Sequence, residues 1–264
     1  MNNSNNIFSS KFFATIALAL LVIFQSCKKN DVAELVAPVA AVENVAALSQ
    51  AVAASAGVAA DKVEFNKNEK EFVIDGDAVV SLEDAKVRFS SKGTAGAASE
   101  ATQMKSPYVV ASAKVNTIKI YCDATVPAVW VATMDSAIKN WNASGSKVYI
   151  QRITTTTGAT TKVTTTYNTT LTFATAVYPD YYGNPGNRIT INTNYNGMET
   201  AKKVFAITHE LGHTLGMSHT NGTYGTLVAG TPITDASSVM NAVCLLWKGF
   251  TSYDLQAIRA VYPK

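Results

Sequence analysis

The stretch from His209 to His219 reads H-E-L-G-H-T-L-G-M-S-H, and it contains all three histidines of the 264-residue chain. His209 and His213 are four residues apart, so on a helix their side chains project from one face, one turn apart. Gly216 permits a left-handed turn that ends the helix and brings His219 back toward the pair. Three converging imidazoles match the ligand set of a zinc ion. The stretch therefore predicts a helix, a turn and a metal centre.

Glu210 follows the first histidine directly, so it points about 100° around the helix from that ligand. This direction is poorly suited to a third ligand and well suited to a general base beside an open fourth coordination position. An open position is typical of a catalytic zinc site rather than a structural one. A bare H-E-x-x-H occurs by chance in unrelated helices, but the added glycine and third histidine make the longer pattern specific.

Composition sets broad limits on the rest of the chain. A hydrophobic content of 47% allows a sizeable core within one or two domains. The formal charge of +3 is too small to indicate nucleic-acid binding. Residues 28–107 are net acidic and residues 108–264 are net basic, so the first part has the charge to dock on the second. The sequence does not define the oligomeric state.

The N-terminus, residues 1–26, resembles an export signal. Lys11 precedes an apolar run at 12–24, which is too short to cross a bilayer as a mature helix. A small residue before Cys27 resembles a bacterial lipobox, although the residues at 24 and 25 depart from its strictest pattern. We expect cleavage before Cys27 and a diacylglycerol anchor on its sulfur. The protein would then be an outer-membrane or surface lipoprotein of the bacterial envelope, and later processing would release it. The alternative is an ordinary secretory signal with an incidental cysteine.

The mature chain divides into a tether, a pro-like segment, a linker and a catalytic domain. The predicted ranges are 27–42, 43–89, 90–107 and 108–264. Within the pro-like segment we expect a helix at 45–56, a strand, turn and strand at 71–80, and a short helix with Ser81 as its N-cap.

Hydrophobic periodicity predicts the elements of the catalytic domain. We expect strands at 115–121, 147–153 and 188–192, and helices at 127–141, 200–215 and 254–261. The threonine-dense residues 154–172 suit exposed strands and a loop. Cys122 and Cys244 either pair in an oxidising envelope or remain unpaired, and neither has zinc-ligand spacing.

At this point the chain resembles the metzincin metallopeptidases. Besides the long zinc motif, these enzymes carry a downstream methionine turn, which Ser238-Val239-Met240-Asn241-Ala242 matches. The resemblance implies that Met240 packs beneath the metal, and the alternative is an ordinary core methionine. Some members place a tyrosine ligand two residues after the methionine. This chain has Ala242 there, so no tyrosine ligand is expected.

More specifically, residues 70–264 resemble the bacterial, matrixin-like "dual-action HEIGH" metallopeptidases. The matching pieces occur in order, namely Asp75-Gly76-Asp77, the zinc motif, Gly230-Thr231-Pro232, the methionine turn, Gly249-Phe250-Thr251-Ser252-Tyr253-Asp254 and Val261-Tyr262-Pro263. The resemblance implies an α+β, zincin-like domain with a twisted mixed sheet, a backing helix, an active-site helix and a small C-terminal subdomain. It also implies a zinc endopeptidase acting on proteins or peptides. Calcium binding is conceivable by analogy, although acidic residues are sparse between 108 and 264.

Two further expectations concern substrate binding and latency. Substrate would lie extended along an edge strand of the sheet, which we place near Arg188–Asn192. No cysteine lies between 28 and 107, which excludes a thiolate switch. Asp77 resembles the aspartate switch of astacin-like zymogens, and the more common alternative is a turn aspartate between two strands.

One rival function is a non-catalytic surface lipoprotein that keeps a metzincin fold for adhesion or binding. Glu210 argues against it, because a non-catalytic metal site has no need of a general base.

Overall fold

The computed structural model describes residues 44–56, 58–90, 103–220, 225–232 and 235–264. The predicted signal peptide, Cys27 and the tether lie outside these residues, as does most of the predicted linker. Among the described residues, no helix combines the length and the apolar character needed to cross a membrane. Residues Glu43–Lys264 group as one compact unit.

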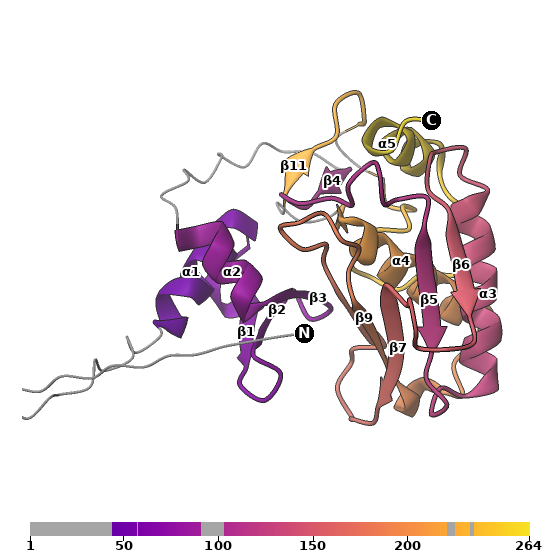
Figure 1. Cartoon of the computed structure of the whole chain (residues 1–264), viewed down its shortest axis with the longest axis horizontal. Helices are drawn as coiled ribbons and strands as arrows, with labels where there is room; N and C mark the ends of the chain where they lie inside the picture. The colour runs from indigo at the N-terminus through magenta and orange to yellow at the C-terminus, as the bar shows by residue number, and fades with distance from the viewer. Residues whose placement is uncertain (1–43, 57, 91–102, 221–224, 233–234) are drawn as a thin grey trace, which may run out of the picture. The chain divides into compact units, whose positions relative to one another are not determined.

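The helices and strands of this unit are shown in Figure 1. In chain order they are α1 (Val45–Ala56), η1 (Ala60–Lys62), β1 (Val63–Asn66), β2 (Glu71–Ile74), β3 (Ala78–Ser81), α2 (Leu82–Ser90), β4 (Met104–Lys105), β5 (Ile118–Cys122), α3 (Ala128–Asn142), β6 (Ile150–Ile153), β7 (Thr161–Thr166), β8 (Ala174–Val177), β9 (Arg188–Asn192), η2 (Thr193–Tyr195), α4 (Thr200–Leu215), β10 (Met217–Ser218), β11 (Thr226–Leu227) and α5 (Ser252–Val261).

The main sheet has eight strands in the order β1-β2-β3-β8-β9-β7-β5-β6. The N-terminal segment contributes an antiparallel meander, β1-β2-β3. Its last strand, β3, pairs in parallel with β8 of the catalytic part. The strand β8 is antiparallel to β9, and the remaining pairs are parallel. This mixed sheet, with its backing and active-site helices, is the predicted α+β, zincin-like architecture.

The topology corrects one expectation. Residues Arg188–Asn192 form β9, which lies between β7 and β8, so the prediction that they form the substrate-binding edge is wrong. The two edges of the catalytic part are β8 and β6, and β3 pairs with β8. The threonine-rich residues 154–172 contain the strand β7 and loops, as expected. The strand β7 pairs on both sides and buries Thr161 and Val163, whereas Lys162 and Thr166 are exposed.

Two long helices pack against each other and against the sheet. The helix α3 buries Trp130, Met134 and Trp141 along one face, which is the 3.6-residue periodicity of an amphipathic helix. The helix α4 buries every residue from Phe205 to Leu215. Its apolar residues Ile207, Leu211 and Leu215 belong to the main core, and a separate, smaller core lies under α1 and α2 in the N-terminal segment.

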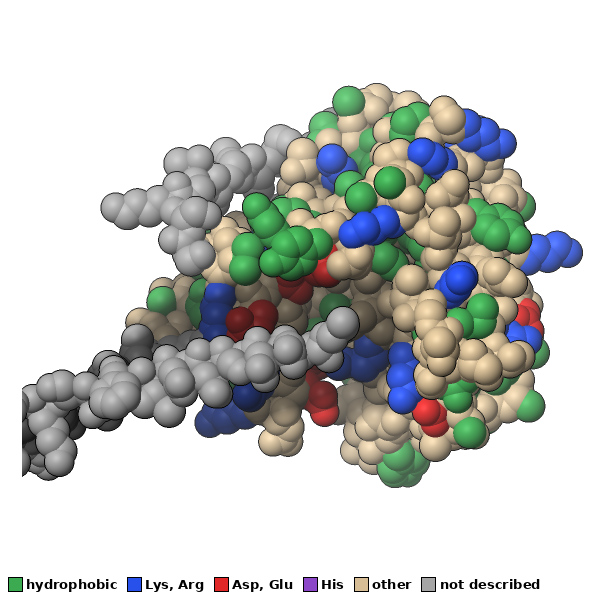
Figure 2. Space-filling view, viewed as in Figure 1, with side chains coloured by type: hydrophobic (Ala, Val, Ile, Leu, Met, Phe, Trp, Pro, Cys, Tyr) green, Lys and Arg blue, Asp and Glu red, His purple; other side chains and the backbone are tan. Residues whose placement is uncertain are grey.

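A three-stranded sheet, β10-β4-β11, lies beside the end of α4. Its central strand, β4, falls within the predicted linker 90–107, and the preceding Gln103 is fully buried. Ser106 donates its backbone N–H to the Gly216 carbonyl, so these residues support the turn after the active-site helix. Figure 2 shows lysine and arginine side chains dispersed over the face that it displays.

Candidate metal centre

The end of α4 places three imidazoles together. His209 and His213 lie one turn apart on the helix, and both are buried. Gly216 ends the helix in a left-handed conformation, with φ of 92°. A Cβ there would lie 2.7 Å from the Tyr108 carbonyl oxygen, so both the turn and the close backbone contact require glycine. The chain then returns through β10 and brings His219 to the pair.

The ring nitrogens of these histidines converge at a distance suited to one metal ion. The Nε2 atom of His219 lies 3.2 Å from that of His209 and 3.1 Å from that of His213. Zinc–nitrogen bonds of about 2.0–2.1 Å in a tetrahedral arrangement place two ligand nitrogens about 3.3 Å apart. Both distances to His219 are therefore close to those of two ligands on one zinc ion.

Each imidazole has a hydrogen-bond acceptor at its other ring nitrogen. The Nδ1 atom of His209 lies 2.7 Å from the Val239 carbonyl oxygen, and that of His213 lies 2.9 Å from the Met217 carbonyl oxygen. The Nδ1 atom of His219 lies 3.3 Å from Oδ2 of Asp75. In a metal-bound imidazole, an acceptor at Nδ1 holds the proton there and leaves Nε2 to bind the ion.

Asp77 brings a carboxylate into the same cluster. It follows the tight turn between β2 and β3, in which Gly76 is left-handed. Its oxygens lie 3.4 Å, 3.7 Å and 3.2 Å from the Nε2 atoms of His209, His213 and His219. The four potential ligand atoms all lie within 4.8 Å of one another. The carboxylate thus lies where a fourth metal ligand would, although it is also the turn aspartate of the alternative interpretation.

The charges in the cluster shift the pKa values of its members. Burial and the neighbouring His209 lower the pKa of His213 well below its usual value. Burial also disfavours charge on His219, but the carboxylates of Asp77 and Asp75 outweigh it and raise the pKa of that imidazole to about 10. For Asp77, burial raises the pKa, yet the histidines, His219 foremost, lower it well below its usual value. A buried anion and a cluster of imidazoles therefore stabilise each other.

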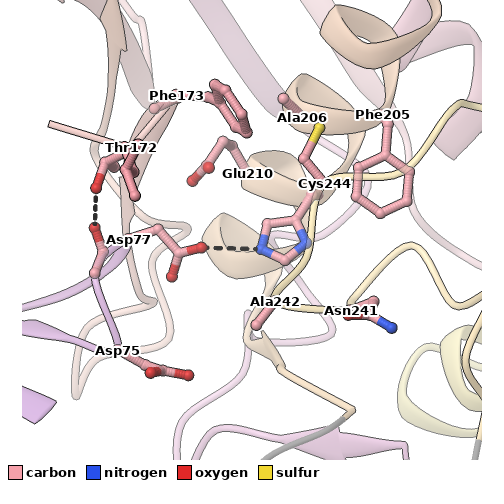
Figure 3. A pocket seen from close by; sticks show the side chains of 14 residues that line it. Asp75, Asp77, Thr172, Phe173, Phe205, Ala206, Glu210, Asn241, Ala242 and Cys244 are labelled. Carbon is pink, nitrogen blue, oxygen red and sulfur yellow. Dashed lines mark hydrogen bonds and ion pairs between the residues drawn. The ribbon is translucent and has the colours of Figure 1, made fainter. Parts of the chain in front are cut away.

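Glu210 lies beside the cluster and lines a cavity of about 230 Å³. Figure 3 shows its carboxylate and that of Asp77 facing the same space. The side chain is 3% exposed, and among the described residues its Oε2 atom has no hydrogen-bond partner. Burial, and then the charge of Asp77, raise the pKa of Glu210 well above its usual value. An unpartnered buried carboxylate at a cavity wall is the chemistry expected of a general base.

The methionine turn packs against α4 from below. Met240 is 1% exposed, and a Cβ added at Gly212 would lie 2.4 Å from its sulfur. Its carbonyl oxygen accepts a hydrogen bond from the N–H of Thr220, the residue after His219. The turn therefore contacts both the helix and the loop that carry the imidazoles.

Two carboxylates near the site were not singled out from the sequence. Asp75 is one, and its signal was its place in the same short turn as Asp77. The other is Asp254, which is buried and accepts hydrogen bonds from the Val239 N–H and from Ser238 Oγ. Its signal was the capping-box pattern with Thr251 at the start of α5. The cysteines at 122 and 244 are both unpaired.

Histidines on a buried helix, a third returning after a glycine turn, and a methionine turn beneath them define a zinc metallopeptidase of the metzincin type. A sequence profile of the dual-action HEIGH metallopeptidase family matches residues 72–262. The chain therefore belongs to this family, and the zinc cofactor and a protein or peptide substrate follow from it.

Comparison with solved structures gives distant relatives. A crystal structure of myroilysin aligns with 56% of this chain and 83% of its own at 16% identity, with a TM-score of 0.41. High choriolytic enzyme 1, a hatching-enzyme zinc protease of the medaka fish Oryzias latipes, aligns with 59% of this chain and 93% of its own at 18% identity, with a TM-score of 0.39. No curated protein matches the chain.

Proposed function

We propose that this metallopeptidase is an endopeptidase in which His209, His213 and His219 hold the zinc ion and Glu210 is the general base. The observation that carries the proposal is that the Nε2 atoms of His209 and His213 lie 3.2 Å and 3.1 Å from that of His219, beside a buried Glu210 whose Oε2 has no hydrogen-bond partner among the described residues. Zinc at such a site lowers the pKa of water to about 7 and polarises a carbonyl group.

Side chains of the protein transfer the protons of the reaction. Glu210 takes a proton from the attacking water and passes it to the leaving amine, so peptide hydrolysis needs no covalent enzyme intermediate. Burial raises the pKa of Glu210 above its usual value, which favours uptake of a proton by this carboxylate. Met240 supports the floor of the site, and the apolar shell around α4 keeps bulk water out.

Replacing Glu210 with glutamine tests this assignment. We expect the Glu210→Gln variant to retain stoichiometric zinc, because the three imidazoles remain, and to lose about 10²–10⁴-fold in kcat on a casein or peptide substrate. Metal content and proteolysis are measured on the same sample. Cleavage at the parental rate would refute the general-base role. Zinc binding without peptidase activity in the parent after the N-terminal segment has been removed would favour the adhesion or binding module instead.

We also propose that residues 43–89 act as a pro-segment joined by a linker at 90–107 to the catalytic domain at 108–264. Two contacts support this. Asp77 lies where a fourth zinc ligand would displace the reacting water. In addition, β3 pairs with β8, the strand that would otherwise offer its edge to an extended substrate. The segment thus competes with substrate for both the metal and the sheet edge.

Removing the Asp77 carboxylate should relieve this block. We expect the intact Asp77→Ala variant to cleave peptides faster than the intact parent, since its fourth zinc position is open to water. The measurement is the initial rate before any proteolysis of the chain, monitored by intact mass. Equal rates for the two intact proteins would dispose of the switch.

The N-terminal sequence supports export and a lipid anchor on Cys27, which would hold the enzyme at the bacterial cell envelope. A fatty-acid analogue should label the parent and should not label the Cys27→Ala variant. The variant should also appear in the soluble fraction. A variant that stayed membrane-bound would exclude this anchor and favour another means of attachment.

A further inference from the structure

The three imidazoles differ in where their second hydrogen-bond partner comes from. His209 and His213 bond through Nδ1 to the backbone carbonyls of Val239 and Met217, both within the catalytic part. His219 instead bonds to the side chain of Asp75, which is 144 residues earlier in the chain, in the N-terminal segment. Two imidazoles are therefore oriented by the catalytic part itself, and the third is oriented by the segment that would block it.

The two carboxylates of the turn contact opposite sides of the same ring. The Nε2 atom of His219 lies 3.2 Å from Asp77, and its Nδ1 atom lies 3.3 Å from Asp75. These contacts have different chemistry. The Nε2 side is the metal side, so Asp77 competes for the ion's coordination sphere. The Nδ1 side is the orienting side, so a carboxylate there holds the ring and increases its basicity as a ligand.

The backbone at Asp75 fixes the direction of its side chain. Its φ is 50°, and Gly76 after it is also left-handed. Asp-Gly is a common pair in the tight turn of a β-hairpin, and aspartate adopts positive φ more readily than most residues. The turn is also tied to the catalytic part, since Thr172 Oγ1 donates to the Gly76 carbonyl. The turn thus holds the carboxylate against His219.

We propose that Asp75 is a positioning residue for the zinc ligand His219, so that the N-terminal segment stabilises the metal centre as well as blocking it. This inference rests on the proposed zinc-ligand set and deepens the proposed latency. A carboxylate acceptor at Nδ1 fixes the ring's tautomer and orientation, and loss of such a partner typically lowers metal affinity about 10–100-fold. The intact chain therefore acquires and retains zinc before the segment is removed.

The test is the zinc affinity of the metal-depleted full-length chain, measured by competition with a chromophoric chelator. Asp75→Gly removes the carboxylate and suits the left-handed backbone. We expect it to weaken zinc binding about 10–100-fold. Asp75→Asn also tolerates positive φ and keeps a neutral acceptor, so it should recover part of that loss. Unchanged zinc affinity in Asp75→Gly would overturn the proposal.

Two controls separate positioning from simple docking. Asp84 accepts the Tyr181 N–H and the Ser81 hydroxyl away from the cluster, so Asp84→Ala weakens docking and the N-cap of α2 and should leave zinc affinity unchanged. In an Asp77→Asn background, Asp75→Gly should still weaken zinc binding. An equal loss in Asp84→Ala, or no loss in the Asp77→Asn background, would overturn the role of Asp75. A parent chain without stoichiometric zinc would instead refute the proposed ligand set.

Discussion

At the scale of single residues, Gly212 marks the tightest contact between the active-site helix and the methionine turn. An added Cβ would lie 2.4 Å from Met240 Sδ and 3.1 Å from its Cε. Glycine inside a helix ordinarily costs about 1 kcal/mol relative to alanine. At this position the lack of a side chain is what allows Met240 to lie against the helix, so packing outweighs helix propensity.

We therefore expect Gly212→Ala to destabilise the fold by about 1–3 kcal/mol, the usual cost of overfilling a packed core. Urea unfolding followed by circular dichroism measures the change. Gly197→Ala is the matched control, because a Cβ there meets nothing within 4 Å, and its stability should not fall. If both variants unfolded at the same urea concentration as the parent, the close contact with Met240 would not limit the size of the side chain at position 212.

The two cysteines give a prediction with a definite pH dependence. Burial raises the pKa of both Cys122 and Cys244 to about 11, whereas an exposed thiol has a pKa of about 8.5. At pH 8 the native thiolate population is then smaller on the order of 100-fold than that of the unfolded chain. We expect slow alkylation by iodoacetamide in the native protein, faster as pH rises toward 11, and rapid reaction in urea. Native labelling as fast as in urea would contradict the burial.

The sequence predicted the zinc ligands of the site but not the contacts that the N-terminal segment makes with them. The spacing of His209, His213 and His219 was enough to predict the ligands, because a helix followed by a glycine turn brings residues at this spacing together. Asp77 could be noted only by resemblance, and the position of Asp75 not at all. Their contacts with the histidines span more than a hundred residues, and no local periodicity encodes which distant groups meet.

At the scale of elements, α5 is held by a capping box that also supports the methionine turn. Thr251 Oγ1 accepts the Asp254 N–H, and Asp254 accepts the Thr251 N–H. The same carboxylate accepts from the Val239 N–H at 3.1 Å and from Ser238 Oγ at 2.6 Å. One side chain thus joins the start of the last helix to the turn beneath the metal.

Thr251→Ala should cost about 1 kcal/mol, the usual value of a helix N-cap. Asp254→Ala should cost clearly more, because it also leaves the buried donors at 238 and 239 without an acceptor, at about 1–3 kcal/mol for each. Chemical denaturation of both variants gives the comparison. Equal losses would mean that the carboxylate acts only as a helix cap.

Elements with their own periodicity were predicted well. The helix α4 has the predicted bounds, and so does α1. The strand β8, however, was missed, since Ala174–Val177 is short and carries no alternation. It is a strand because β9 and β3 pair with it on either side. Its neighbours determine its structure more than its own residues do, and this also explains why the substrate edge was misplaced to β9.

At the scale of the whole molecule, an ion pair away from the metal joins the N-terminal segment to the catalytic part. Arg188, at the start of β9, pairs with Glu71 of β2 and lies 3.8 Å from Glu69. The Glu71 side chain is 9% exposed and that of Arg188 is 28% exposed, so solvent screens this pair only in part. This ion pair is a specific contact of the kind expected when an acidic segment docks on a basic domain.

Glu71→Ala should weaken docking by about 1.5–3 kcal/mol, the usual value of a charge-assisted hydrogen bond, and so reduce the docked population about tenfold or more relative to the undocked one. We expect higher peptidase activity of the intact chain and faster limited proteolysis of the segment. Asp135→Ala breaks the exposed Arg152 pair elsewhere and serves as the control. If the two variants behaved alike, the Arg188 contact would not contribute to latency.

The pairing of β3 with β8 has a consequence for the shortened enzyme. The N–H groups of Ala176 and Tyr178 now donate to the carbonyls of Asp77 and Val79. Once the N-terminal segment has been removed, β8 becomes an unpaired edge strand. An extended polypeptide can then pair with it, including β8 of a second molecule. The freed protease should therefore self-associate reversibly at high concentration, and an excess of peptide substrate should dissolve the aggregates.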